Sequence, residues 1–128
     1  MITVKGFRYY DDYRCPTYAK EFSSITEFEK WIQITAVDKK RIHIPPQDVN
    51  GDYDQHWAGS FSGHLSFVDE RRGSLPSVSC HICTVEKDGM IIFSSGDYTG
   101  GKGHISSEMK ETLSRLRAYI NAEYSFAP

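Results

Sequence analysis

The sequence lacks any long hydrophobic run, and no stretch approaches the roughly 18–20 apolar residues of a membrane-spanning helix. The first residues, MITVKGF, lack the apolar core of a signal peptide, so we expect a cytoplasmic protein without a membrane partner. Cysteine is scarce, and three is an odd number that fits reduced thiols better than a disulfide framework. These absences argue against membrane proteins and disulfide-stapled secreted domains.

An excess of one charge is also missing, since fifteen basic residues stand against seventeen acidic ones, a formal net charge of −2. No overall electrostatic field therefore draws the chain toward nucleic acid, which is disfavoured as a partner. The 128 residues, 39% hydrophobic and 25% charged, are typical of a globular protein. We expect one domain over residues 1–128 with a core of its own.

The clearest local pattern is a β-hairpin. Residues 78–85 and 90–93 are short apolar runs rich in β-branched side chains, and Asp88 and Gly89 lie between them. An Asp-Gly pair in this position is typical of a tight hairpin turn. Residues 2–10 alternate apolar and polar side chains and predict a first strand, with a bulge at Gly6.

Further strands are expected in the middle of the chain. Residues 41–44 alternate briefly before two prolines, and residues 59–68 alternate Phe and Leu with small polar residues. Residues 11–16 are read as a polar loop, because Pro16 excludes a central strand there.

The first helix is expected to begin at Ser24, which forms a capping box with Glu27, and to run to about Val37. The basic run of residues 39–41 suits the negative end of that helix. Four polar side chains of the helix are expected to face water: Glu27, Glu29, Lys30 and Gln33.

The second helix is expected to begin after Ser106, with Glu108 near its positive end. Glu111 and Arg115 stand four residues apart in the order that favours a surface ion pair. One apolar stripe is expected to face the core: Met109, Leu113, Leu116, Ile120 and Tyr124. Strands and helices together predict an α+β fold, a mainly antiparallel sheet of about five strands with two helices packed on one face.

Residues 96–104 are rich in glycine and partly match a phosphate-binding loop. The pattern G-x-x-x-x-G-K is present from Gly96 to Lys102, but Gly103 stands where a hydroxyl should hold magnesium. The expected helix also begins only at Ser106 or Ser107. We therefore favour a simple connection, with weak anion binding by Lys102 and exposed amides as the alternative.

Cys80 and Cys83 have the spacing of a zinc knuckle or redox pair, but they lie in an expected strand that points them to opposite faces. We read them as buried structural thiols. Residues 48–54 resemble a calcium loop but lack its glycine and its final acid. No metal, no cofactor and no catalytic residue is predicted.

Aromatic side chains gather in an otherwise polar stretch of residues 53–61. They form either a protein contact surface or a loop that folds back into the core, and the sequence does not separate these alternatives. Together with the glycine-rich loop they make up the candidate binding residues: Tyr53, His56, Trp57, Phe61, Gly96, Gly101, Lys102 and His104.

Three short patterns, residues 6–10 (GFRYY), 41–45 (RIHIP) and 96–99 (GDYT), precede the final helix. In these patterns the chain resembles small uncharacterised proteins carried on conjugative transposons of Gram-positive gut bacteria. The resemblance implies an accessory role on a mobile element and attaches no activity to it.

The leading hypothesis is a non-catalytic accessory or inhibitor-like domain that binds another protein and is itself a monomer or weak dimer. One alternative is a small enzyme or anion-binding domain that uses residues 96–104. Another is a binder of single-stranded nucleic acid that uses sheet aromatics, which the acidic balance disfavours.

Overall fold

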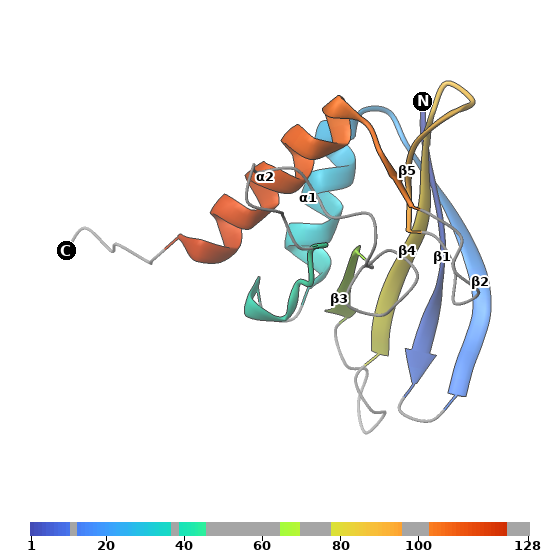
Figure 1. Cartoon of the computed structure of the whole chain (residues 1–128). Helices are drawn as coiled ribbons and strands as arrows, with labels where there is room; N and C mark the ends of the chain where they lie inside the picture. The colour runs from blue at the N-terminus through green and yellow to red at the C-terminus, as the bar shows by residue number, and fades with distance from the viewer. Residues whose placement is uncertain (11–12, 37–38, 46–64, 70–77, 96–102, 123–128) are drawn as a thin grey trace.

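A computed structural model describes residues 1–10, 13–36, 39–45, 65–69, 78–95 and 103–122. Within them, six strands form one antiparallel sheet, and α1 (Ile25–Thr35) and α2 (Ser107–Asn121) lie on the same face of it (Figure 1). This arrangement confirms the predicted α+β class and the placement of both helices. No helix of the described part is long and apolar enough to cross a membrane.

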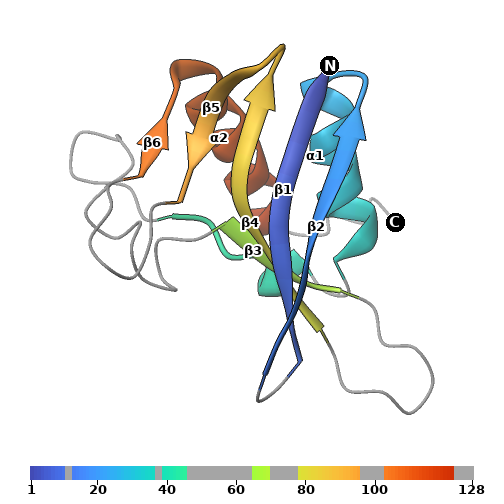
Figure 2. The same ribbon diagram turned by 90° about the vertical axis from the view of Figure 1, so that its right-hand side faces the viewer.

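The strands in chain order are β1 (Ile2–Tyr10), β2 (Tyr13–Phe22), β3 (Leu65–Asp69), β4 (Val78–Lys87), β5 (Met90–Ser94) and β6 (His104–Ile105). Their order in the sheet is β2-β1-β4-β5-β6, and β3 also pairs with β4. Strand β4 is thus central, with β1 along one side and β3 and β5 along the other. Strand β2 lies at one edge of the sheet (Figure 2).

The predicted hairpin of β4 and β5 is confirmed. Its turn residues have positive φ angles, 50° for Asp88 and 85° for Gly89. A two-residue hairpin turn of the I′ type requires positive φ at both central positions, and Asp and Gly tolerate it best. Local chemistry therefore explains the turn.

The predicted loop over residues 11–16 is wrong for residues 13–16, which belong to β2. The reason is the position of β2 at the edge of the sheet, where a proline interrupts no inner ladder. The register between β1 and β2 shifts between Phe7 and Tyr9, near the same level of the sheet.

Gly6 marks an irregularity of β1, as predicted, because the register with β4 shifts between Lys5 and Gly6. A Cβ atom at Gly6 would lie 1.9 Å from the His81 carbonyl oxygen and 2.8 Å from the Tyr18 hydroxyl. A side chain therefore does not fit at this position without movement of the backbone.

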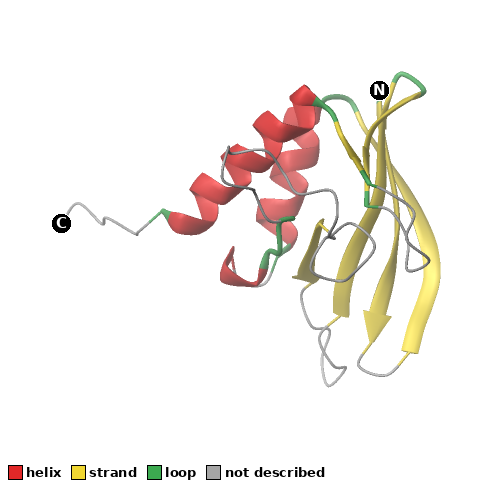
Figure 3. Cartoon of the chain, viewed as in Figure 1, coloured by secondary structure: helices red, strands yellow, loops and turns green. Residues whose placement is uncertain are grey.

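Helix α1 begins as predicted, with the Ser24 Oγ accepting a hydrogen bond from the Glu27 N–H at 3.3 Å. Its end differs from the prediction. The helix stops at Thr35, and the extended Ala36 caps it by donating to the Ile32 carbonyl at 2.9 Å. The basic residues form a separate 3-10 helix, η1 (Lys39–Arg41), so they do not sit in the last turn of α1 (Figure 3).

The short strand predicted at residues 41–44 is wrong. This segment makes a single bridge, in which the His43 and Ser66 backbones exchange hydrogen bonds at 2.7 and 3.0 Å. The strand predicted over residues 59–68 is present from Leu65 onward, and residues 59–64 lie outside the described part. A segment forms a strand only where it pairs with a neighbouring strand over several residues, and residues 41–44 pair at one residue only.

The core lies between the sheet and the helices. Phe28 and Ile32 of α1 and Leu113 of α2 are fully buried against it. Ile120 packs at its border, and Tyr124 lies outside the described residues. Strand β2 contributes only the partly buried Tyr18 and Phe22. The other strands contribute these buried members: Ile2, Val4, Leu65, Phe67, Cys80, Ile82, Val85, Ile92, Phe93 and Ile105.

Glu29, predicted to face water, is 9% exposed and points toward α2. The Arg115 guanidinium binds its carboxylate, with Nε donating to the two oxygens at 2.9 and 3.2 Å and Nη2 donating to Oε1. The predicted surface pair of Glu111 and Arg115 is thus replaced by a bond between the helices. Packing of α2 beside α1 brings these distant residues together.

Candidate functional site

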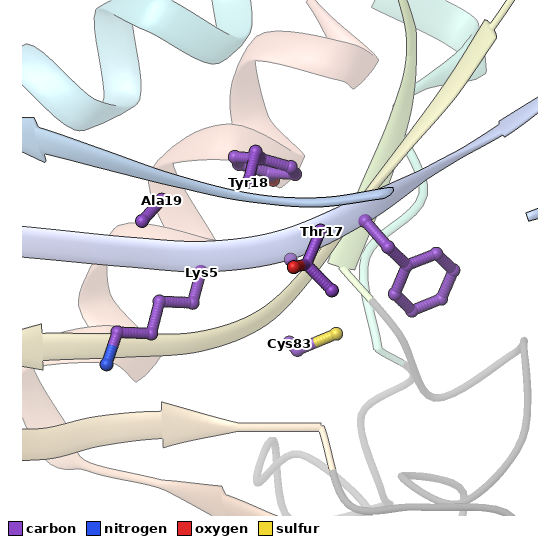
Figure 4. Close-up of a pocket in the computed structure, with 7 residues that line it drawn as sticks. Lys5, Thr17, Tyr18, Ala19 and Cys83 are labelled. Atoms are coloured by element: carbon purple, nitrogen blue, oxygen red, sulfur yellow. The ribbon is translucent and has the colours of Figure 1, made fainter. Parts of the chain in front are cut away.

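A hollow of about 530 Å³ opens at the level of Gly6 on β1, beside β2 and β4. Figure 4 shows Lys5, Thr17 and Cys83 on one side of the strands, and Tyr18 on the other. Its lining residues are Lys5, Gly6, Phe7, Thr17, Tyr18, Ala19 and Cys83. The hollow therefore belongs to the face of the sheet that the helices do not cover (Figure 2).

Strand alternation places the lining side chains on this face. The register pairs Phe7 with Thr17 and Lys5 with Ala19, so these four side chains share one side of the β1–β2 ladder. Thr17 and Ala19 are small and exposed, and Lys5 is exposed as well. The β2 side of the hollow is consequently low and open toward the edge of the sheet.

A stacked pair of rings closes the opposite side. Phe7 lies parallel to His81 of β4, with ring centroids 4.9 Å apart and planes 7° apart. Both residues are buried, 5% and 7% exposed, yet neither belongs to the main core cluster. Phe7 thereby gives the hollow an apolar wall.

The two cysteines face different surroundings, as strand alternation predicts. Cys80 is fully buried in the core, whereas Cys83 is partly exposed and lines the hollow. The reading of both as buried thiols is therefore right for Cys80 only. Among the described residues, no group of three or more His, Cys, Asp or Glu side chains could hold a metal ion.

The outer edge of β2 adjoins the hollow. Within the described part of the chain, β2 pairs with β1 alone, so one side of this ten-residue strand has no ladder partner there. Between residues 17 and 21, only Tyr18 is partly buried, and the other four residues are exposed: Thr17, Ala19, Lys20 and Glu21. Unpaired N–H and C=O groups at such an edge are available to another strand.

Cations and aromatic rings lie on the helix side of the same edge. The Lys20 ammonium lies 5.4 Å from the ring centroid of Trp31 and 6.0 Å from that of Phe22. The Arg8 guanidinium lies 5.3 Å from the ring centroid of Tyr18. These are cation–π distances, so the aromatic rings hold both cations near the edge.

Tyr18 is a structural hydrogen-bond donor. Burial raises the pKa of its hydroxyl far above the ordinary value, and the neighbouring Cys80 thiol raises this pKa further. The hydroxyl donates to the His81 carbonyl at 3.2 Å, and it accepts a hydrogen bond from the Cys80 thiol, with the Cys80 Sγ 3.2 Å from the Tyr18 hydroxyl oxygen. A phenol held neutral in this way anchors β2 to the sheet.

Of the residues predicted from the sequence to bind, only His104 lies in the described part. It is exposed on β6, opposite Ser94 of β5. The others lie outside the described residues: Tyr53, His56, Trp57, Phe61, Gly96, Gly101 and Lys102. Sequence reasoning missed β2 and the hollow, although the strand formers Thr17, Tyr18 and Phe22 offered a weak signal.

The chain matches no protein-family model, no curated protein and no solved structure.

Proposed function

We propose that this protein is a non-catalytic, protein-binding domain of accessory or inhibitor type, carried on a mobile genetic element and acting in the cytoplasm. The observation that carries the proposal is the open edge of β2 beside the hollow. An unpaired edge is a template for other chains, and proteins usually blunt it with proline or charge. Pro16 lies near one end, and between Thr17 and Phe22 the strand has no proline.

On the helix side this stretch carries one charge, that of the exposed Lys20. Lys20 lies over the rings of Trp31 and Phe22, where its ammonium is held close to the protein surface. The side chains around the hollow offer contact area, with Lys5 in an ion pair with Glu86 at 3.4 Å. Edge and hollow together form a continuous surface of the kind that protein partners use.

A role in binding single-stranded nucleic acid is less well supported by the same residues. Bases bind such proteins by stacking on exposed aromatic faces. Here Lys20 lies over Trp31, and Trp31 packs edge-on against Phe67 with centroids 5.2 Å apart. These rings are engaged within the protein.

Site-specific photocrosslinking in the source cell tests the proposal. A photoreactive residue replaces Ala19 on β2 or, as a matched control, Ala118, an exposed alanine of α2. We expect one discrete protein adduct at position 19 that is absent at position 118. Equal labelling at both positions, or adducts of position 19 with nucleic acid, would contradict the proposed function.

A further inference from the structure

We propose that the edge of β2 binds its partner as an added β-strand in which acidic and apolar side chains alternate. This inference rests on the proposed function and specifies its mode of recognition. It follows from three features at this edge of the sheet: a strand whose outer side has no partner among the described strands, cations on one face and a hollow on the other.

The backbone of β2 is regular along its outer edge. Residues 17–22 of β2 pair with residues 2–7 of β1 without a shift in register. Such a regular stretch presents its outward N–H and C=O groups at even spacing, as the addition of a strand requires. Successive side chains of the added strand then point alternately to the helix side and to the hollow side.

The helix side of the edge favours an acid. Lys20 is exposed, and both it and Arg8 are held over aromatic rings. A carboxylate on the added strand beside Lys20 would meet a cation whose ring contacts already fix its position. Cross-strand pairs of opposite charge are favourable, and like charges in that position are unfavourable.

The hollow side favours an apolar residue. Ala19 and Thr17 are small, and the hollow is also lined by Phe7 and Lys5. An aliphatic side chain reaching over Ala19 would cover this surface and leave water. An acid there would meet Lys5, the register partner of Ala19, which is already in an ion pair with Glu86. It would also face the like charge of the exposed Glu21, which lies two residues from Ala19 on the same face.

A second copy of β2 fits less well than a different protein. In a two-fold antiparallel pairing with both helix layers on one face, Lys20 would lie opposite a helix-side residue of the other copy. Between residues 17 and 22 those are Tyr18, Lys20 and Phe22, and none is acidic. The acid must therefore come from another sequence.

Three synthetic peptides of about eight residues, the length of an ordinary strand, test the inference. One alternates glutamate and valine, the second has the same composition in two blocks, and the third alternates lysine and valine. Affinity is measured by titration, and backbone protection by residue-resolved amide exchange. We expect the alternating glutamate peptide to bind at least about tenfold more tightly than either other peptide.

Amide exchange identifies the mode of binding. An added strand should slow exchange at every second amide between residues 17 and 22, because only alternate amides point outward. No binding, equal binding of the lysine peptide, or protection confined to other elements would overturn the inference. Protection of these amides that grows with protein concentration in the absence of peptide would replace the proposed partner by a second copy.

A charge reversal supplies an independent readout. Lys20→Glu should weaken binding of the glutamate peptide by about fivefold and strengthen that of the lysine peptide. Arg41→Glu is the matched control, since it makes the same change of charge on exposed η1, and should alter neither. If both variants change peptide binding equally, the preference for the glutamate peptide depends on the net charge of the protein alone. That result would overturn the specific role of Lys20.

The two proposals can fail separately. A crosslinked partner at position 19 whose binding protects no alternate amides of β2 would retain the proposed function and overturn strand addition. Absence of any protein adduct would overturn the proposed function, whatever the peptides show.

Discussion

The Tyr18 hydroxyl on β2 donates a hydrogen bond to the His81 carbonyl on β4 at 3.2 Å, although β1 lies between these strands. The side chain can cross β1 because Gly6, its register partner, has no side chain of its own. The edge strand is therefore tied to the central strand as well as to its neighbour. This bond holds the open edge in place.

Removing that hydroxyl should weaken the protein at neutral pH. Tyr18→Phe keeps the ring and loses one hydrogen bond, so we expect the free energy of unfolding to fall by about 1 kcal/mol. Urea unfolding measures the change. The matched control is Tyr119→Phe on α2, which should change stability by less than about 0.5 kcal/mol.

Alkaline pH should narrow the difference in the free energy of unfolding between the parent and Tyr18→Phe. Burial raises the pKa of Tyr18 in the folded state above its ordinary value of 10.0, so above about pH 10 the unfolded chain binds fewer protons. Stability from this group is thus complete below that pH and is lost as pH rises, by up to about 1.4 kcal/mol per pH unit. The free energy of unfolding of the parent and of Tyr18→Phe is measured from about pH 8 upward. If it falls equally steeply with pH in both proteins, the raised pKa of Tyr18 is contradicted.

Gly6→Ala should be strongly destabilising. The new Cβ would meet the His81 carbonyl oxygen, which belongs to the backbone and cannot turn away. We expect a loss of about 3 kcal/mol, as for severe overpacking. Gly89→Ala at the hairpin turn has open space but a φ of 85°, and should cost only about 1 kcal/mol. Thermal unfolding of both variants compares the two causes, and equal losses would be inconsistent with this account.

The interhelical ion pair should contribute more than the predicted surface pair. Arg115→Ala leaves the Glu29 carboxylate buried without its guanidinium, and solvent around the half-exposed Arg115 limits the loss to about 1–2 kcal/mol. Glu111→Ala should change stability by less than about 0.5 kcal/mol. A double-mutant cycle of Arg115→Ala with Glu29→Gln, followed by urea unfolding, measures the coupling, and additivity of the two changes would disprove it.

Trp31 should matter for the fold and not only for the edge. Its ring packs edge-on against Phe67 and lies 5.3 Å from the centroid of Phe22, so Trp31→Ala removes contacts to two strands. We expect a loss of about 3 kcal/mol. Ile34→Ala, at a position 82% exposed on the same helix, is the control and should be nearly neutral. Comparable melting temperatures for the two variants would show that Trp31 contributes little to the core.

Short-range features of the fold could be predicted from the sequence. The turn at Asp88 and Gly89 and the start of α1 at Ser24 depend on residues within four positions of one another. The stripe of α2 likewise follows from its spacing, and the structure buries its members Met109, Leu113 and Leu116. Propensity and capping act locally, so a pattern in the chain is enough to predict them.

Segments whose structure depends on distant partners were predicted less well. Residues 13–16 form a strand because β1 pairs with them at the sheet edge. Residues 41–44 form none, because only His43 meets β3. The end of α1 at Thr35 also differs from the expectation, since Ala36 turns the chain before the basic residues. Strand pairing is a property of two segments, and one segment alone does not reveal it.

By itself, the sequence determined the class of the fold, the hairpin and both helix starts, because turn and cap chemistry act between neighbours. Tertiary structure decided the candidate site. The β1–β4 pairing brings Phe7 and Cys83 to the same hollow. The open edge exists because β2 is last among the described strands of the sheet. It also decided that Glu29 binds Arg115, 86 residues away, since a helical period shows which face a side chain takes but not which element will cover it.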